Sequence, residues 1–316
     1  MEAEGVMRVA VVGVGGVGGY FGGRLAQSGV DVTFIARGAT LEALRTRGLR
    51  VESTHGDFAL ERVNATDQPS EIVDAILVCV KAWQIPDAVA RVQPMIGPDT
   101  MVVPLENGID APDVLASIVG REHVLGGLCG IVSFIVEPGH IRHTAVEPFV
   151  MFGELDNRPS ERAQRLCDAF RNAGVKADVP PDILHSMWTK FLFIAPISAI
   201  GALTRVPIGE WRAMPELRAI AEDSLREMIA LAKARGVDPG DDALQRTMDR
   251  YDNLAAASTS SLQRDVMEGK PSELDAQIGA VVRLASESGV AVPVCSLLYH
   301  LLLPQERRVV RASGAP

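Results

Sequence analysis

A glycine-rich turn between a short apolar strand and a helix constrains this chain more than any other feature. Residues 8–12 are of β type, Gly13, Gly15 and Gly18 follow as G-x-G-x-x-G, and a helical pattern leads to a second strand at 30–36. In such a βαβ unit the glycines permit a tight turn, a close approach of a pyrophosphate, and close packing of helix on strand. The pattern therefore favours a dinucleotide site over a purely structural glycine turn, because the helix N-terminus attracts phosphate. The predicted cofactor contacts in this loop are Gly13, Gly15, Gly16, Val17 and Gly18.

The end of the second strand distinguishes the two nicotinamide cofactors. A carboxylate there accepts a hydrogen bond from the ribose of NAD, whereas a cation suits the 2′-phosphate of NADP. This chain has Arg37 at that place, and the nearest carboxylate, Glu42, lies beyond the strand. The planar guanidinium matches a phosphate group, so we predict NADPH. The alternative is a solvated arginine in an ordinary loop.

Composition limits the classes of function that remain. The chain has 316 residues, enough for two domains, and 47% hydrophobic residues, which is ordinary for a globular protein. A net charge of −9 disfavours binding to a nucleic-acid backbone as the main activity. The four cysteines show no C-x-x-C spacing, so we expect reduced structural thiols and predict no metal ion.

The sequence shows no targeting segment. Residues 1–7 are acidic, unlike the basic start of a signal peptide. The longest uncharged runs, near 124–136 and 191–204, are shorter than the roughly 20 residues of a membrane span. We therefore expect a soluble, cytoplasmic protein with no membrane partner.

The first half alternates between strand-like and helix-like stretches, which indicates a parallel sheet flanked by helices. The apolar run at 75–80 is typical of a strand buried on both faces. Pro180-Pro181 then marks a boundary, which divides the chain into domains 1–181 and 182–316. Further strands are predicted at 49–52, 101–105, 124–128, 149–153 and 175–179.

The second half has the spacing of long helices. Residues 216–235 repeat apolar side chains every three or four positions, and 273–288 do the same. Ser272 fits the N-cap of the latter helix and Gly289 its C-terminal cap. The second domain is therefore predicted to be all-helical, with surfaces that could form a homodimer.

Two polar residues follow strands of the first half. Lys81 comes directly after the run 75–80, at the expected carboxyl edge of the sheet beside the cofactor. Asn107 follows the run 101–105, and its amide can both donate to and accept from a ligand. The alternatives are a solvated loop lysine and an ordinary Asn-Gly turn.

A lysine and a glutamate of the second half have catalytic chemistry. Lys190 is the only charged side chain between Asp182 and Arg205, and a partly buried ammonium can act as a general acid. Glu273 is placed in the first turn of a helix, where the dipole favours an ionised carboxylate that could orient an ammonium. The alternatives are a lysine that reaches solvent along its helix and a first-turn acid with no further role.

These residues together resemble the ketopantoate reductases (2-dehydropantoate 2-reductases) over nearly the whole chain. The order and spacing of the motifs carry the resemblance. They are the glycine loop with Arg37, Lys81-Ala-Trp-Gln84, Glu106-Asn107-Gly108, Trp188-Thr-Lys190, Ser260-Ser-Leu-Gln-Arg-Asp265, Gly269-Lys-Pro-Ser-Glu273 and Gly289-Val-Ala-Val-Pro293.

The resemblance implies a Rossmann-type α/β domain and an all-α domain similar to the C-terminal domain of 6-phosphogluconate dehydrogenases. It implies NADPH-dependent reduction of a 2-oxo acid to a 2-hydroxy acid, the step from ketopantoate to pantoate in pantothenate biosynthesis. Lys190 would be the general acid and Glu273 an acid that orients Lys190 or the substrate. Asn107 and Ser261 would contact the substrate, with Asn107 also near the nicotinamide, and Lys81 would lie near the cofactor.

The chain departs from the family at the helix that carries Lys190. Family members usually have Asn four and eight residues after the catalytic lysine, on the same helix face. Here these substrate-contacting positions hold Ile194 and Ser198. Pro196 lies between them and is expected to interrupt the helix, because proline lacks a backbone donor. Ile194 offers no hydrogen bond, so the pocket is expected to be more apolar. The alternatives are thus a reductase for a more apolar 2-oxo acid or ketone, and a non-catalytic NADPH-binding protein.

Overall fold

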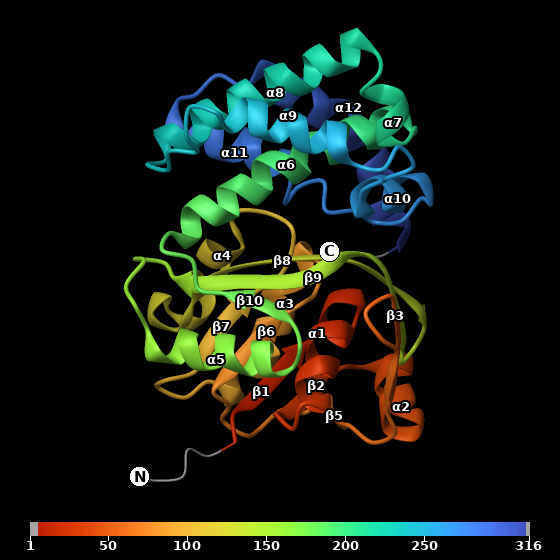
Figure 1. The fold of residues 1–316 in the computed structure, drawn as a ribbon, viewed down its shortest axis with the longest axis vertical. Coiled ribbons are helices and arrows are strands. Elements are labelled where there is room, and N and C mark those ends of the chain that lie inside the picture. The colour runs from red at the N-terminus through yellow and green to blue at the C-terminus, as the bar shows by residue number, and fades with distance from the viewer. Residues whose placement is uncertain (1–5, 314–316) are drawn as a thin grey trace. The chain divides into compact units, whose positions relative to one another are not determined.

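The chain folds into two compact units (Figure 1). The computed structural model describes residues 6–313, so most of the acidic start lies outside the described residues. One unit comprises Met1–Glu106 and Ala111–Ile183, and the other comprises Asn107–Asp110 and Leu184–Pro316. The short segment Asn107–Asp110 therefore belongs to the second unit although the first surrounds it in sequence.

A five-stranded parallel sheet forms the centre of the first unit. Its order is β5-β2-β1-β6-β7, with β1 paired to β2 on one side and to β6 on the other. The direction of winding therefore reverses between β1 and β6, which is where ligands bind in open α/β sheets. The strands are β1 (Arg8–Val12), β2 (Asp31–Ile35), β5 (Asn64–Thr66), β6 (Ala75–Val78) and β7 (Met101–Pro104).

Alternate residues of β1 pack into two separate cores, as expected for a strand buried on both faces. Val9 and Val11 face a core shared with α1 and α5, and Ala10 and Val12 face one shared with α3 and α4. The helical segments of this unit are α1 (Gly16–Gln27), α2 (Gly38–Arg47), η1 (Ala82–Gln84), α3 (Ile85–Val92), η2 (Gln93–Met95), α4 (Ala111–Val119), η3 (Arg121–His123) and α5 (Glu161–Asn172).

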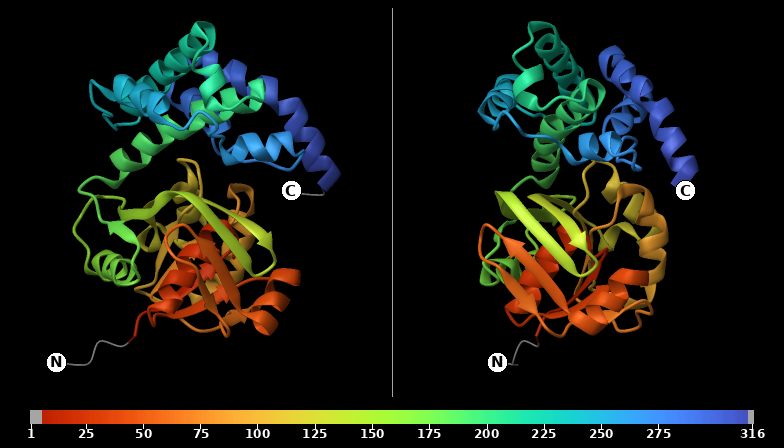
Figure 2. Two further views of the ribbon diagram at one scale, coloured as in Figure 1. Left: turned by 45° about the vertical axis from the view of Figure 1, so that its right-hand side comes forward. Right: turned by 90° about the vertical axis from the view of Figure 1, so that its right-hand side faces the viewer.

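A second sheet of the first unit was not expected from the sequence. The runs predicted at 124–128 and 149–153 are the ends of a long antiparallel hairpin, β8 (Leu125–Glu137) and β9 (His140–Glu154). Figure 2 shows this hairpin in yellow-green from two further sides. Strand β9 also pairs with β3 and β10, so these segments do not extend the parallel sheet. The remaining strands are β3 (Leu49–Ser53), β4 (Phe58–Leu60) and β10 (Lys176–Asp178).

A buried ion pair ties the end of β9 to α5. Glu154 is 6% exposed, and Arg162 donates to its two carboxylate oxygens at 2.7 and 2.8 Å. Burial by itself raises the pKa of Glu154, but the hydrogen bonds from Arg162 and Ser160 outweigh it and hold the pKa below its usual value. The carboxylate is therefore ionised and paired at neutral pH.

Arg162→Met should reduce the free energy of unfolding at pH 7 by about 2 kcal/mol, because it leaves a buried carboxylate unpaired. A lowered pKa in the folded state means that Glu154 contributes its stability above its unfolded pKa and loses it as the pH falls. The deficit should therefore shrink towards about pH 4, near the ordinary glutamate pKa. Urea unfolding at pH 7 and at about pH 4 measures this loss of stability. Arg158→Met, which removes an exposed guanidinium 4.0 Å from the same carboxylate, is the matched control and should have little effect.

The described part of the second unit, apart from the Asn107–Asp110 segment, is helices and connecting turns. The predicted helix at 216–235 is confirmed as α8 (Pro215–Ala234), with Pro at its first position. The other helices are α6 (Ile183–Thr204), α7 (Ile208–Trp211), α9 (Ala243–Asn253), α10 (Ser261–Met267), α11 (Ile278–Ser288) and α12 (Pro293–Ser313). A parallel α/β unit followed by a helical unit confirms the predicted fold class.

Helix α6 is the longest helix in the described chain. By length and composition its 22 residues could cross a membrane, although the sequence runs had suggested that no segment was long enough. However, 67% of its most apolar window is buried inside the protein, as in a core helix. The burial of Phe191, Leu192 and Ala195 places this helix within the core of the second unit.

Candidate active site and cofactor loop

The glycine loop lies where the winding of the sheet reverses. Gly13 follows β1 with a φ of 93°, a conformation that side chains rarely adopt. A Cβ at this position would also lie 2.7 Å from Val80 Cγ1 and 2.8 Å from the carbonyl oxygen of Cys79. The turn thus packs directly against the end of β6, as predicted for the first glycine of the motif.

The other two glycines of the motif differ in how closely the protein packs around them. A Cβ on Gly18 would overlap with the carbonyl oxygen of Gly13, so only glycine lets α1 approach the turn. A Cβ on Gly15, the N-cap of α1, would meet nothing closer than Ile135 Cδ1 at 4.0 Å. Packing within the protein therefore does not require a glycine at position 15. Open space at the N-terminus of a helix fits the pyrophosphate of a dinucleotide.

Ser133 is a residue of this loop region that the sequence analysis did not identify. Its carbonyl oxygen would lie 2.7 Å from a Cβ on Gly16, so β8 crosses the first turn of α1. Its hydroxyl is buried and has no hydrogen-bond partner among the described residues. Val17, also predicted to contact cofactor, is partly buried against the core of the first unit. No sequence signal linked Ser133 to the loop, because the contact spans more than a hundred residues.

Arg37 lies two residues beyond β2 and begins α2. It is exposed, and its guanidinium has no hydrogen bond or ion pair within residues 6–313. Its backbone is extended, with a φ of −145°. A guanidinium at the end of the second strand that forms no ion pair with a carboxylate among the described residues can bind an anionic ligand.

Lys81 follows β6 at the same edge of the sheet as Gly13. It is partly buried, its backbone N–H donates to Gln84 Oε1 at 3.2 Å, and its carbonyl accepts from the Gln84 N–H at 2.8 Å. These two bonds hold Lys81 at the start of η1. The predicted position of Lys81 at the carboxyl end of β6 is thus confirmed, and its cofactor role stays a prediction.

Lys190 lies in the second turn of α6, within a mainly apolar stretch. Trp188, Phe191 and Leu192 around it are nearly fully buried. Lys190 itself is partly buried, and its ammonium has no hydrogen-bond or ion-pair partner among the described residues. No hydrogen bond or ion pair therefore joins Lys190 to Glu273 in this structure, and the role of Glu273 in orienting either Lys190 or the substrate stays a prediction. A partly desolvated ammonium with no partner is suited to bind and protonate an oxygen of a ligand.

Helix α6 continues through Pro196, which the sequence suggested would interrupt it. Proline lacks an N–H and so leaves the carbonyl of Leu192 without its helical donor. The hydroxyl of Tyr251 lies beside this gap, since it donates to the Phe193 carbonyl at 2.8 Å and is 3.4 Å from the Leu192 carbonyl. Burial raises the pKa of Tyr251 well above its usual value, so the hydroxyl remains a donor. The path of the helix after Lys190 is thereby kept.

The two positions after Lys190 that depart from the family pattern differ in exposure. Ile194 is partly buried, whereas Ser198 is completely buried. The Ser198 hydroxyl has no hydrogen-bond partner among the residues described. Neither side chain supplies the amide that the family usually has there, and their contact with a substrate stays a prediction.

Ser261 is brought close to α6 by tight helix packing. It is the first residue of α10, after the N-cap Ser260, whose hydroxyl accepts from the Gln263 N–H at 3.0 Å. A Cβ on Gly201 of α6 would lie 2.5 Å from Gln263 Oε1. The helix that begins with Ser261 therefore packs directly on the helix that carries Lys190.

The segment that holds Asn107 meets the turn that holds Glu273. Gly108 has a φ of 144°, and a Cβ there would lie 2.9 Å from the carbonyl oxygen of Ala276. Asp110 of the same segment accepts from Arg283 of α11 at 2.7 Å. Two predicted site residues from distant parts of the sequence, Asn107 and Glu273, are thus on neighbouring backbone segments.

The predicted helix start at Ser272 is wrong. Helix α11 begins at Ile278, and residues 273–277 form a turn. The Ser272 hydroxyl donates to Glu306 of α12 and caps no helix. Glu273, 5% exposed, is therefore held by this turn and not by a helix dipole. The predicted C-terminal cap is confirmed, since Gly289 has a φ of 66°.

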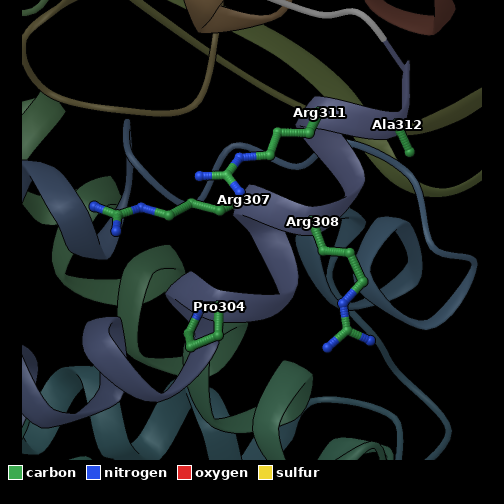
Figure 3. A pocket seen from close by; sticks show the side chains of 5 residues that line it. All are labelled: Pro304, Arg307, Arg308, Arg311 and Ala312. Carbon is green, nitrogen blue, oxygen red and sulfur yellow. The ribbon is translucent and has the colours of Figure 1, made fainter.

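A hollow of about 570 Å³ at the end of α12 contains none of the predicted site residues. Figure 3 shows its arginine side chains, which extend from the last turns of the helix. Cations there are favoured by the helix dipole. The lining residues are Pro304, Arg307, Arg308, Arg311 and Ala312.

Comparison with known proteins shows the family to which this chain belongs. The family model described as ketopantoate reductase PanE/ApbA matches residues 9–157, and that of its C-terminal region matches residues 182–306. The chain belongs to the ketopantoate reductase family. It is accordingly an oxidoreductase of the 2-dehydropantoate 2-reductase type that acts on a small molecule with a nicotinamide cofactor.

Individual relatives agree over almost their full length. The chain is 33% identical to the uncharacterized oxidoreductase YkpB of Bacillus subtilis, over 93% of this chain and 97% of the relative. It is 32% identical to the 2-dehydropantoate 2-reductase of Archaeoglobus fulgidus, over 94% and 97%. The crystal structure of 2-dehydropantoate 2-reductase from Geobacter metallireducens has a TM-score of 0.88 and 29% identity, over 94% and 99%.

Proposed function

We propose that this protein reduces a 2-oxo acid to a 2-hydroxy acid with NADPH, with ketopantoate as the first candidate substrate. The observation that carries the proposal is the partly buried ammonium of Lys190, which has no partner among the described residues of a ketopantoate reductase family member. A lysine kept in an apolar stretch without a counter-charge is costly unless a ligand completes the site.

The glycine loop and Arg37 would hold the cofactor. NADPH, when bound, supplies the hydride. The N-terminus of α1 would bind the pyrophosphate at Gly15, where the protein leaves open space, and Arg37 would bind the 2′-phosphate. Lys81 and Asn107 would contact the nicotinamide half.

Lys190 would act as the general acid. As hydride reaches the carbonyl carbon, negative charge develops on the carbonyl oxygen, and a hydrogen bond from Nζ stabilises it. The proton of Lys190 then passes to that oxygen, which completes the hydroxyl group. Glu273, Asn107 and Ser261 would orient the substrate, with Ile194 and Ser198 lining the pocket.

A more apolar 2-oxo acid or ketone is the second candidate substrate. Ile194 offers a hydrocarbon surface one turn from Lys190, and Ser198 is completely buried. Without amide groups at these two positions of α6, the pocket would discriminate less strongly in favour of the hydroxyl of ketopantoate. The substrate range therefore decides between the two candidates.

The loss of NADPH absorbance tests the proposal, first with ketopantoate and then with pyruvate, 2-oxoisovalerate and phenylglyoxylate. Rapid oxidation with ketopantoate would support the first candidate and make Ile194 a tolerated variation. Turnover of phenylglyoxylate without turnover of ketopantoate would support the apolar pocket. NADPH binding with no oxidation across the panel would contradict the proposal. The cytoplasmic location and the homodimer stay predictions.

Arg37→Asp should lower the affinity for NADPH by about tenfold or more and change the affinity for NADH much less, because only NADPH carries the 2′-phosphate. Fluorescence titration of both cofactors measures the ratio. Arg91→Asp on α3 makes the same change in net charge at another exposed arginine and is the control. An unchanged NADPH to NADH ratio in Arg37→Asp would refute the phosphate assignment.

A further inference from the structure

The turn that carries Glu273 is held on both sides by helix α12. This turn, residues 273–277, joins α10 to α11 and has no regular secondary structure of its own. Glu273 and its neighbour Ser272 are both polar, yet they are only 5% and 4% exposed. The position of the buried carboxylate therefore depends on how the backbone of this turn is held.

Glu306 holds the residue before Glu273. Its carboxylate accepts the backbone N–H of Ser272 at 2.8 Å and the Ser272 hydroxyl at 2.6 Å. The two bonds fix both the backbone and the side-chain rotamer of Ser272. Charge-assisted bonds of this kind are about twice as strong as neutral ones. Glu306 thus sets the position from which the chain enters Glu273.

Tyr299 holds the residue two positions after Glu273. Its hydroxyl donates to Asp275 Oδ1 at 2.5 Å, and burial together with Asp275 raises the pKa of Tyr299 to about 12. Tyr299 and Glu306 are seven residues apart on α12, which places them two turns apart on one face. The same helix face therefore contacts both sides of Glu273.

The stability of the fold alone does not account for a carboxylate at position 306. Glu306 is 7% exposed, and burial raises its pKa, which shows that desolvation opposes its charge. An apolar side chain at such a position often gives equal or greater stability than a buried charged group. Among the described residues the Glu306 carboxylate forms hydrogen bonds only with Ser272, the neighbour of Glu273, and this is better explained by the geometry that the bonds impose.

We propose that Glu306 and Tyr299 are positioning residues that act on the reaction through Glu273. The proposal rests on the proposed function, in which Glu273 orients the substrate or Lys190. A displaced carboxylate would still allow cofactor binding, but the substrate would be held in a less productive geometry. Misplacement of about 1 Å can reduce the rate by up to 10²-fold.

A double-mutant cycle tests this role with NADPH and the 2-oxo acid that the panel identifies. Glu306→Gln keeps the size of the side chain but leaves only one acceptor for the two donors of Ser272. We expect kcat to fall about tenfold, with the KM for NADPH changed by less than about twofold. In a Glu273→Gln background, Glu306→Gln should lower kcat no further, because its effect passes through the Glu273 carboxylate.

Two further variants make the outcomes distinct. Tyr299→Phe removes only the bond to Asp275, should lower kcat in the same way, and carries the test if Glu306→Gln does not fold. Gln305→Ala on the same helix removes a bond to the Val266 carbonyl and should leave kcat unchanged. Normal kcat in Glu273→Gln would overturn the role of Glu273 and the proposal with it. A low kcat in Glu273→Gln with normal or additive effects of Glu306→Gln and Tyr299→Phe would overturn only the positioning role.

Discussion

Lys190→Ala is expected to lower kcat by about 100-fold or more, the usual loss when a general acid is removed. The alkoxide that forms during hydride transfer would lose the ammonium that stabilises and protonates it. The affinity for NADPH should stay within about twofold, because the glycine loop and Arg37 belong to the other compact unit. Steady-state turnover and fluorescence titration of NADPH separate the two quantities.

Lys233→Ala is the matched control for Lys190→Ala. Lys233 is an exposed lysine of α8 in the same unit, so its removal makes the same change in charge. Near-normal turnover in Lys190→Ala would refute the assignment of the general acid. An equal loss in both variants would point to net charge and not to a local role. Partial recovery of Lys190→Ala by added methylammonium would support proton donation from this position.

Local sequence patterns predicted the elements whose contacts are local. The strand at 8–12, its turn and the helix after it appear as expected, because the glycine spacing leaves few other conformations. The hairpin β8–β9 was missed although its two strands pair locally through the turn between Glu137 and His140, and only the pairing of β9 with β3 involves a distant part of the chain. Only the first five of the 13 residues of β8 are buried, and Phe134, Ile135 and Val136 are exposed, so its apolar pattern gave no strand boundary.

The candidate site shows the same distinction between local and distant causes. The helical spacing around Glu273 suggested a helix that starts at Ser272, but Glu306, 34 residues away, takes the Ser272 hydroxyl for a different bond. Likewise, Pro196 predicted a break in α6 that the structure does not show, and the hydroxyl of Tyr251, 58 residues after Phe193, donates to the Phe193 carbonyl beside it. Residue type and spacing indicated Lys190 and Glu273 as candidates, and their catalytic roles stay predictions. These patterns did not reveal the side chains that hold these two residues in place.

The glycines of the loop provide the last prediction, because the structure assigns them different physical roles. Gly18→Ala should reduce the free energy of unfolding by about 3 kcal/mol, since its Cβ would overlap with the Gly13 carbonyl and force the backbone apart. Gly15→Ala should leave stability nearly unchanged, because its Cβ meets no protein atom closer than 4.0 Å. Chemical unfolding without cofactor measures both values.

The affinity for NADPH should distinguish the same two variants in the opposite direction, with the larger loss in Gly15→Ala. The methyl group of Gly15→Ala would occupy the space proposed for the pyrophosphate, so the Kd for NADPH should rise at least about tenfold although the apoprotein is intact. Gly18→Ala should lose affinity only as far as its loop is displaced. If Gly15→Ala binds NADPH normally, the phosphates do not approach the backbone at this glycine. Reduced stability together with weak binding in Gly15→Ala would mean instead that the open space at the start of α1 is needed for folding. The comparison therefore tests the reason for each glycine, and not merely the presence of the motif.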